Sequence, residues 1–398
     1  MHRADPPPQP PGQGVAAADR PLVDVALIVG TIAAYQLGTG ILSALVPFRL
    51  GGTDAAAALT GFVSSAYSVG FLGGCLVGPW LVATLGPRRL MAASAIAAAF
   101  VAIALWATPA GPSWAGLRAF AGFASGAYLT LAEAWLADRA PARHRGAAFS
   151  AYLTMSRMVF AIGQISLAFA ETTAFALFAI AAMGYCAGPL VAAQVSRPPP
   201  PMGQRHFGSL AEVPLRAPVA ALTAALHGST TVSSVSLLPL WGLDHGLTVP
   251  AIAAMLMAIQ LSGIAFQIPL GILSDRVGRK AVMAVVCAGV AGLSIVAPAA
   301  AGWPAALAVP VVGAWGGIAF VLYSLSAALM NDIARPDQRV AWSGSLLVVW
   351  GAGASIGPFA TSLAMDAWGT GALFAVIGLS SAALLPVLSI ARRGPAAS

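Results

Sequence analysis

The stretch GILSDRVGRK, residues 271–280, concentrates charge in a chain that otherwise avoids it. Four charged residues lie there between two long apolar runs: Asp275, Arg276, Arg279 and Lys280. Only 8% of the 398 residues are charged and 59% are hydrophobic, whereas a soluble domain is about 45–50% apolar and about 25% charged. The composition therefore predicts an integral membrane protein, with this stretch at the membrane surface.

Apolar runs of about 20 residues, the length that crosses a bilayer, follow one another with short breaks. We predict an all-α membrane protein with twelve transmembrane helices. The predicted spans lie near residues 24–48, 57–85, 88–108, 113–136, 146–169, 173–195, 218–241, 250–273, 280–300, 304–328, 340–364 and 371–391.

The longest internal polar stretch, residues 197–216, separates these spans into two sets of six. We therefore expect one six-helix bundle at 21–196, a cytoplasmic linker at 197–216 and a second bundle at 217–391. The segments 1–20 and 392–398 would be tails. Residues 1–20 are rich in Pro and Gly and lack the apolar core of a signal peptide, so we expect a disordered tail.

The basic residues predict the orientation, because cytoplasmic loops of membrane proteins are enriched in Lys and Arg. With a cytoplasmic N-terminus, 17 of the 20 Lys and Arg residues fall in inner segments. Outer segments then contain only Arg49, and Arg118 and Arg157 lie inside helices. This distribution predicts that both termini are cytoplasmic, and it explains the net charge of +7 without a nucleic-acid partner.

An internal repeat supports two related halves. Gly86 and Gly278 are 192 residues apart, each between the second and third predicted helix of its half. Three further pairs are each 194 residues apart: Asp138 and Asp332, Arg145 and Arg339, and Gly163 and Gly357. A duplicated six-helix unit, as in many transporters, fits these offsets.

The motif Gly271-x-Leu273-x-Asp275-Arg276-x-Gly278-Arg279-Lys280 resembles the loop signature of the major facilitator superfamily (MFS) of secondary transporters. The resemblance covers essentially the whole chain after residue 20. It implies the MFS fold and a charged latch between the two halves on the cytoplasmic side. The first-half copy, residues 78–89, keeps Gly86 but has Ala83 where the acid belongs.

Residues 117–153 and 317–332 resemble the YcaD-like group within that superfamily, and Arg118 with Gly122 matches an arginine–glycine motif that many members have in helix 4. These resemblances imply a transporter and do not name its cargo. We expect a monomeric protein of the bacterial inner membrane that moves a small solute with protons by alternating access, with efflux as one of two directions that the sequence leaves open. A non-transporting sensor and a membrane-embedded enzyme are the alternatives.

Polar side chains inside predicted spans are candidates for a cavity, because an ionisable residue at mid-span costs roughly 2.5–3.5 kcal/mol. Arg157 shares a helix face with Ser150, Thr154 and Gln164. If Arg157 binds cargo, a carboxylate or phosphate is favoured, since its guanidinium makes bidentate contacts with both. The candidate cavity residues are Arg157, Arg118, His227, Tyr35, Gln36, Gln164, Gln260, Gln267 and Tyr323.

Each candidate also has a structural interpretation. Arg157 and Arg118 could stabilise helix packing instead of contacting cargo. His227 titrates near neutral pH and could couple transport to protons, or it could be a neutral histidine bonded to a neighbouring helix. The glutamine and tyrosine side chains could link helices.

A cytoplasmic gate is predicted from Asp275, Arg276, Gly278, Arg279, Lys280, Glu133, Arg145, Asp332 and Arg339. Asp275 is expected near Arg145 of the opposite half, and Arg276 or Arg279 near Glu133 or Asp332. The five His residues and three Cys residues are scattered without metal-ligand spacing, so we predict no metal site, no cofactor and no enzymatic activity.

Overall fold

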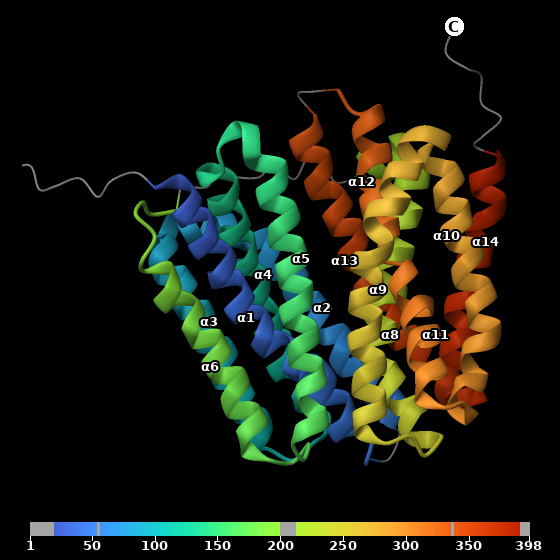
Figure 1. Ribbon diagram of the computed structural model, residues 1–398. Coiled ribbons are helices and arrows are strands. Elements are labelled where there is room, and N and C mark those ends of the chain that lie inside the picture. Colours follow the sequence, from blue (N-terminus) through green and yellow to red (C-terminus); the bar gives the residue numbers. More distant parts are fainter. Residues whose placement is uncertain (1–19, 54–55, 200–211, 336–337, 391–398) are drawn as a thin grey trace, which may run out of the picture.

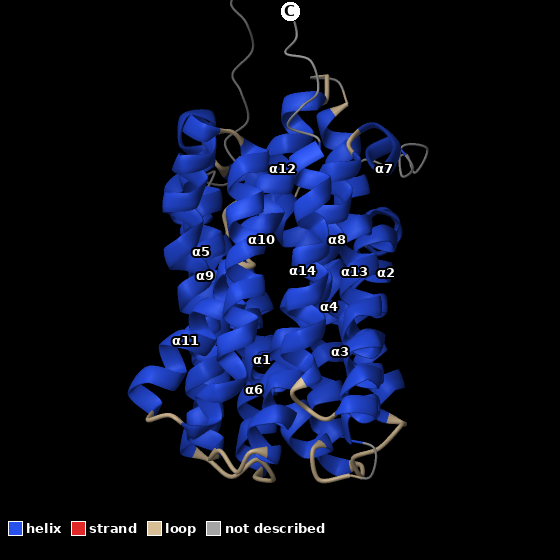
Figure 2. Ribbon diagram, turned by 90° about the vertical axis from the view of Figure 1, so that its right-hand side faces the viewer, coloured by secondary structure: helices blue, strands red, loops and turns tan. Residues whose placement is uncertain are grey.

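The computed structural model describes residues 20–53, 56–199, 212–335 and 338–390, and these ranges contain helices and loops but no strand (Figure 2). Among the described residues, ten helical segments are long and apolar enough to cross a membrane, and one of them, Ala305–Ile333, consists of two consecutive helices. The protein is therefore an all-α, multi-pass membrane protein.

The first half of the chain, residues 20–199, contains α1 (Pro21–Leu50), α2 (Ala56–Leu85), α3 (Pro87–Ala107), α4 (Trp114–Arg139), α5 (Arg145–Ile165) and α6 (Phe175–Ala192). The second half, residues 212–390, begins with the short α7 (Glu212–Arg216) and continues with α8 (Pro218–Asp244), α9 (Val249–Val277), α10 (Arg279–Val296), α11 (Ala305–Ile318), α12 (Val321–Ile333), α13 (Arg339–Trp368) and α14 (Ala372–Ile390).

Every predicted span overlaps a helix, and the span predicted at 304–328 is divided between α11 and α12. Helices α4 and α8 match predicted spans in length but are not among the ten. Both contain ionisable side chains, Arg118 in the first third of α4 and His227 nearer the middle of α8. The count of twelve spans therefore stays a prediction.

Most helix packing occurs within each half. In the first half, α1 packs on α5 and α6, and α2 and α3 pack on α4. In the second half, α8 packs on α13, α9 on α11 and α10 on α14. Figure 1 shows the two groups of helices side by side, and α2 with α13 and α5 with α9 make the main contacts between them.

The repeat detected in the sequence corresponds to equivalent close contacts. A Cβ atom on Gly163 of α5 would lie 2.7 Å from the Leu37 carbonyl oxygen of α1. A Cβ atom on Gly357, 194 residues later in α13, would lie 2.5 Å from the Ser229 Cα of α8. Each glycine thus lets the helix of the fifth predicted span of its half approach that of the first, as small residues do at helix interfaces.

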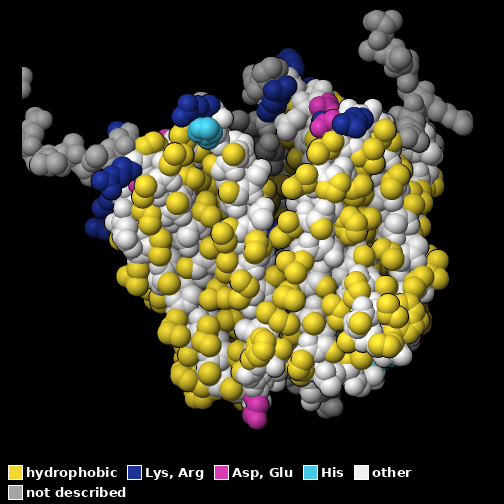
Figure 3. All heavy atoms as spheres, in the orientation of Figure 1, with side chains coloured by type: hydrophobic (Ala, Val, Ile, Leu, Met, Phe, Trp, Pro, Cys, Tyr) yellow, Lys and Arg dark blue, Asp and Glu magenta, His cyan; other side chains and the backbone are white. Residues whose placement is uncertain are grey.

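Lys and Arg side chains gather at one end of the molecule, called the basic end here, above a largely apolar lateral surface (Figure 3). At this end the motif copies form two tight turns. Gly86 separates α2 from α3 with φ of 80°, and Gly278 separates α9 from α10 with φ of 94°. Both glycines adopt positive φ angles that other residues rarely adopt. The predicted loop at 271–280 is therefore mostly helix, with a turn at Gly278 alone.

Candidate functional site

A cavity of about 350 Å³ lies between the two halves. Its walls come from α1, α2, α4 and α5 on one side, and from α8, α9, α13 and the α11–α12 junction on the other. Of the nine predicted cavity residues, five line it: Gln36, Arg118, Arg157, His227 and Gln260. These explain the polarity of α4 and α8, because the helices that face the cavity contain its ionisable groups.

Arg157 reaches from the first half to the second. Its guanidinium carbon Cζ lies 4.2 Å from the centre of the Phe320 ring at the α11–α12 junction. A Cβ atom on Gly263 of α9 would lie 2.9 Å from Arg157 Nη1. This nitrogen is buried and has no hydrogen-bond partner. A cation–π contact therefore stabilises the guanidinium while part of its hydrogen-bonding capacity remains unused.

Arg118 has a similar environment within the first half. It is 6% exposed, and its Cζ lies 4.1 Å from the centre of the Tyr67 ring. Its Nε and Nη1 atoms are buried without a hydrogen-bond partner. Burying an unpaired charge is unfavourable. The cavity thus contains two guanidinium groups, each beside an aromatic ring and each with unpaired N–H donors.

His227 lies on α8 and contacts α13. Trp350 Nε1 donates a hydrogen bond to His227 Nδ1 at 2.8 Å. An indole N–H can only donate, so Nδ1 is the acceptor and the neutral ring carries its proton on Nε2. His227 Nε2 is buried without a hydrogen-bond partner. The structure therefore leaves one imidazole N–H unused in the wall of the cavity.

No carboxylate occurs among the described residues that line this cavity. The remaining lining side chains are aromatic, aliphatic, or neutral and polar. Phe71, Phe160 and Trp350 provide much of the apolar wall, with hydroxyl groups such as those of Thr39 and Ser68 between them. The cavity is consequently electropositive and amphipathic.

The sequence profile of the Major Facilitator Superfamily matches residues 27–263 and 219–398, which together cover nearly the whole chain. The chain belongs to the Major Facilitator Superfamily. An "Uncharacterized MFS-type transporter" from Yersinia pestis is 27% identical over 374 residues, covering 91% of this chain and 94% of the relative. The "Uncharacterized MFS-type transporter YcaD" from Escherichia fergusonii is 25% identical over 377 residues, covering 92% of this chain and 96% of the relative.

The solved structure of the nucleoside transporter NupG has the same fold. It superposes with a TM-score of 0.75 at 13% identity, covering 94% of this chain and 100% of that chain. The expected MFS membership and the similarity to YcaD are therefore confirmed.

Four predicted cavity residues of this MFS chain do not line the cavity. The Tyr35 hydroxyl lies 3.0 Å from that of Ser125, and its ring stacks on Tyr128. Gln164 is fully buried with both amide atoms unpartnered. Gln267 is partly buried elsewhere on α9. Tyr323 packs beside the cavity residue His227, with the two ring centres 5.6 Å apart.

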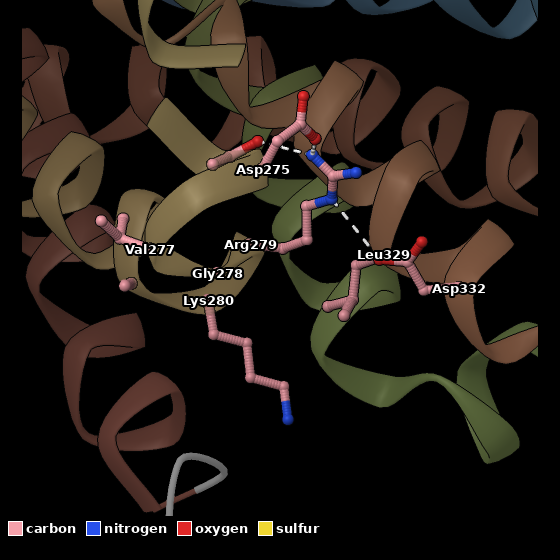
Figure 4. Close-up of a pocket in the computed structure, with 9 residues that line it drawn as sticks. Asp275, Val277, Gly278, Arg279, Lys280, Leu329 and Asp332 are labelled. Carbon is pink, nitrogen blue, oxygen red and sulfur yellow. Dashed lines mark hydrogen bonds and ion pairs between the residues drawn. The ribbon is translucent and has the colours of Figure 1, made fainter. Parts of the chain in front are cut away.

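Five predicted gate residues of the second half line a separate pocket at the basic end (Figure 4): Asp275, Gly278, Arg279, Lys280 and Asp332. Arg279 forms an ion pair with Asp275, and its Nη1 donates to the Ser274 hydroxyl at 2.7 Å. Arg279 Nε also lies 3.4 Å from Asp332 Oδ2. Lys280 and Gly278 line the same pocket. The gate residues thus link the α9–α10 turn to the end of α12.

Asp275 lies in the last turn of α9, and its described ion pair is with Arg279, the first residue of α10 in its own half. The side chain of Arg145, the expected partner, lies outside the described part of the chain. Arg276 and Arg339 are exposed. Glu133 accepts a hydrogen bond from the Tyr152 hydroxyl at 2.5 Å.

Sequence reasoning missed a buried ion pair in the first half. Arg139 at the end of α4 donates to Asp24 at the start of α1, and both side chains are nearly fully buried. Ser196, after α6, also donates to Asp24, through its backbone N–H at 3.0 Å and its hydroxyl at 2.5 Å. An acid near a helix start usually indicates an interfacial side chain, so no pattern in the sequence pointed to this contact.

Trp350, Tyr67 and Phe320 were also missed as cavity residues. Aromatic residues within apolar transmembrane runs produce no distinctive periodicity. The one available signal is that a buried Trp needs an acceptor for its N–H, which here is His227.

Proposed function

We propose that this MFS protein is a secondary active transporter that moves a small solute through the central cavity by alternating access. The observation that carries the proposal is the position of the cavity between the two halves, with walls from both. Rocking of one half against the other would expose such a site to each side of the membrane in turn. The volume of about 350 Å³ lies at the low end of the range for small-molecule sites.

The conformation supports an inward-facing state. At the end opposite the basic end, the α1 terminus packs against α8, where a Cβ atom on Gly51 would lie 2.9 Å from Leu243 Cδ1. At the basic end the surface is indented between the halves (Figure 3), and Glu133 on α4 is exposed. The basic end would face the cytoplasm by the positive-inside rule.

The topology proposed with this function has twelve spans. Helices α4 and α8 would join the ten apolar spans, one of which is α11 with α12, as cavity-facing spans. The two bundles at 21–196 and 217–391 would rock against each other, with both termini and the linker in the cytoplasm of a bacterial inner membrane.

Proton coupling and the direction of efflux belong to the same proposal. His227 is the cavity residue whose ordinary pKa is nearest to neutral pH. A proton bound there on one side of the membrane and released on the other would couple the pH gradient to the solute. Solute flux in liposomes, measured with either sign of an imposed pH gradient, tests coupling and direction together.

A reversible disulfide tests alternating access. In a background with Cys75, Cys186 and Cys287 replaced, we introduce Gly51→Cys and Leu243→Cys at the outer contact. We expect oxidation to crosslink the pair, to abolish solute currents on solid-supported membranes, and to be reversed by reduction. Each single-cysteine variant is the matched control. Unchanged currents with a fully formed crosslink would contradict alternating access, and solute binding without currents in the unlocked protein would favour a sensor.

A further inference from the structure

The central cavity contains positive charge without a described counter-charge. Arg118 and Arg157 both line it, and neither forms an ion pair among the described residues. Two acids of the first half, Asp24 and Glu133, have protein partners. Asp24 binds Arg139, and Glu133 binds Tyr152. A solute that supplies the missing negative charge would therefore complete the site.

The unpartnered atoms of the cavity define the solute further. Arg157 Nη1, Arg118 Nε and Nη1, and His227 Nε2 are buried and make no hydrogen bond. The guanidinium atoms are donors only, and His227 Nε2 is a donor in the neutral tautomer set by Trp350. A solute with acceptor oxygens could form hydrogen bonds with these unpaired donors.

The rest of the wall indicates an apolar body on that molecule. Phe71, Phe160, Phe320 and Trp350 line the cavity together with aliphatic side chains such as Val232. A bare inorganic anion would leave these surfaces in contact with water. An organic anion would bury its apolar part against them while its acidic group reaches the guanidinium groups.

The position of Arg157 links anion binding to both halves. Its guanidinium belongs to α5 of the first half but stacks on Phe320 and lies beside Gly263 of the second half. His227 and Trp350 also belong to the second half. A carboxylate bound by Arg157 could therefore contact groups that move relative to each other during transport.

We propose that the cargo is a small organic carboxylate with an aromatic or aliphatic body. Arg157 binds the carboxylate, Arg118 adds a second favourable charge, and His227 Nε2–H donates to one oxygen. This inference rests on the proposed function, because it names the solute class of the same cavity. The guanidinium fork matches a carboxylate in a bidentate contact.

The test measures binding, without transport. Purified full-length protein in detergent is titrated with small carboxylates, each paired with its carboxamide and its amine, for example benzoate, benzamide and benzylamine. Inorganic phosphate and chloride serve as anions without an apolar body. We expect carboxylates to raise the melting temperature in a saturable way, because a ligand that binds only the folded state stabilises it. Amides, amines and inorganic ions should not.

The variants locate the site. Arg157→Gln should weaken carboxylate affinity roughly ten- to hundredfold, the range for losing a charge-assisted hydrogen bond. Arg157→Lys should recover only part of the loss. Arg49→Gln is the matched control, since Arg49 also lies over aromatic rings, at 5.9 Å from those of Trp114 and Phe178, but does not line the cavity. It should bind carboxylates as the unchanged protein does.

Three results would overturn the proposal. Equal stabilisation by the amides or amines would show that negative charge is not required. Stabilisation by phosphate or chloride alone would show that no organic body is recognised. Full carboxylate affinity in folded Arg157→Gln and Arg118→Gln proteins would place the binding elsewhere. Carboxylate binding without solute currents would leave this inference standing and contradict the transport proposal, so the two failures are distinguishable.

Discussion

At the basic end, the two halves differ in the ion pairs that link their helices. In the first half, Asp24 and Arg139 form a pair that is nearly fully buried and links α1, α4 and the segment after α6. In the second half, Arg279 links α9 to α12 through Asp275 and Asp332, whose side chains are 63% and 55% exposed. A duplicated fold has thus retained two equivalent glycine turns while its charged contacts have diverged.

The difference in burial predicts a difference in energy. Removing one partner of a buried ion pair leaves an uncompensated charge and costs about 3–5 kcal/mol. Exposed pairs contribute about 0–1 kcal/mol, because water and salt screen them. Of these two contacts, the one whose loss should cost more is therefore the buried pair, which does not belong to the glycine motif.

The largest expected effect is at the buried pair. Asp24→Ala should lower the free energy of unfolding by about 3–5 kcal/mol, because Arg139 loses its carboxylate partner in a buried site. Unfolding in mixed micelles, followed by tryptophan fluorescence, measures this loss. Ser196→Ala is a milder control that removes one hydroxyl donor. A loss below about 1 kcal/mol for Asp24→Ala would mean that water reaches the pair and that the two halves do not differ in this respect.

The two glycine turns should respond alike. Gly86→Ala and Gly278→Ala each place a side chain at positive φ, and no heavy atom lies within 4 Å of the added Cβ in either turn. The cost is therefore backbone strain of about 1–3 kcal/mol in both halves. The same unfolding measurement compares them directly. A clear difference between the two variants would show that the turns are not equivalent.

Asp275→Asn should have little effect on stability, at most about 1 kcal/mol, because its pair with Arg279 is exposed. Its effect is expected on conformation, since the motif lies at the basic end where the halves must close. The variant should turn over more slowly with little change in carboxylate affinity. Normal solute currents in a folded Asp275→Asn protein would show that Asp275 makes only a local contact with Arg279.

The smallest effect is expected when the ion pair of the second-half motif is introduced into the first-half copy. The first-half copy has Ala83 and Pro87 at the positions of Asp275 and Arg279. Ala83→Asp combined with Pro87→Arg restores both residues of the i,i+4 pair near Asp138, the counterpart of Asp332. A gain of only a few tenths of a kcal/mol is expected from such a surface pair. Neither single variant should stabilise, and a gain above about 1 kcal/mol would mean that exposed pairs matter here.

The comparison also explains what the sequence could predict. Apolar length identified the helices, because a bilayer requires it of any spanning helix. The glycine motif was visible because turn chemistry is local. Ionisable side chains inside spans identified Arg118, Arg157 and His227 as cavity residues, since such side chains are costly in contact with lipid.

The remainder depends on contacts between distant segments. Asp24 and Arg139 are far apart in the chain, as are His227 and Trp350, and no local pattern specifies that they meet. Tyr35 and Gln164 have the polarity of cavity residues, but helix rotation buries them against neighbouring helices. The divided span at α11 and α12 was missed because a break that remains apolar leaves no compositional signal.

The central claim is that the two halves alternate around one cavity. Two pairs of spin labels test it by double electron–electron resonance: Asp138 with Ile333 at the basic end, and Gly52 with Asp366 at the opposite end. In the presence of saturating carboxylate or at changed pH, the basic-end distance should shorten as the opposite-end distance lengthens. Distances that stay fixed under every condition, or that change in the same direction at both ends, would contradict alternating access in this protein.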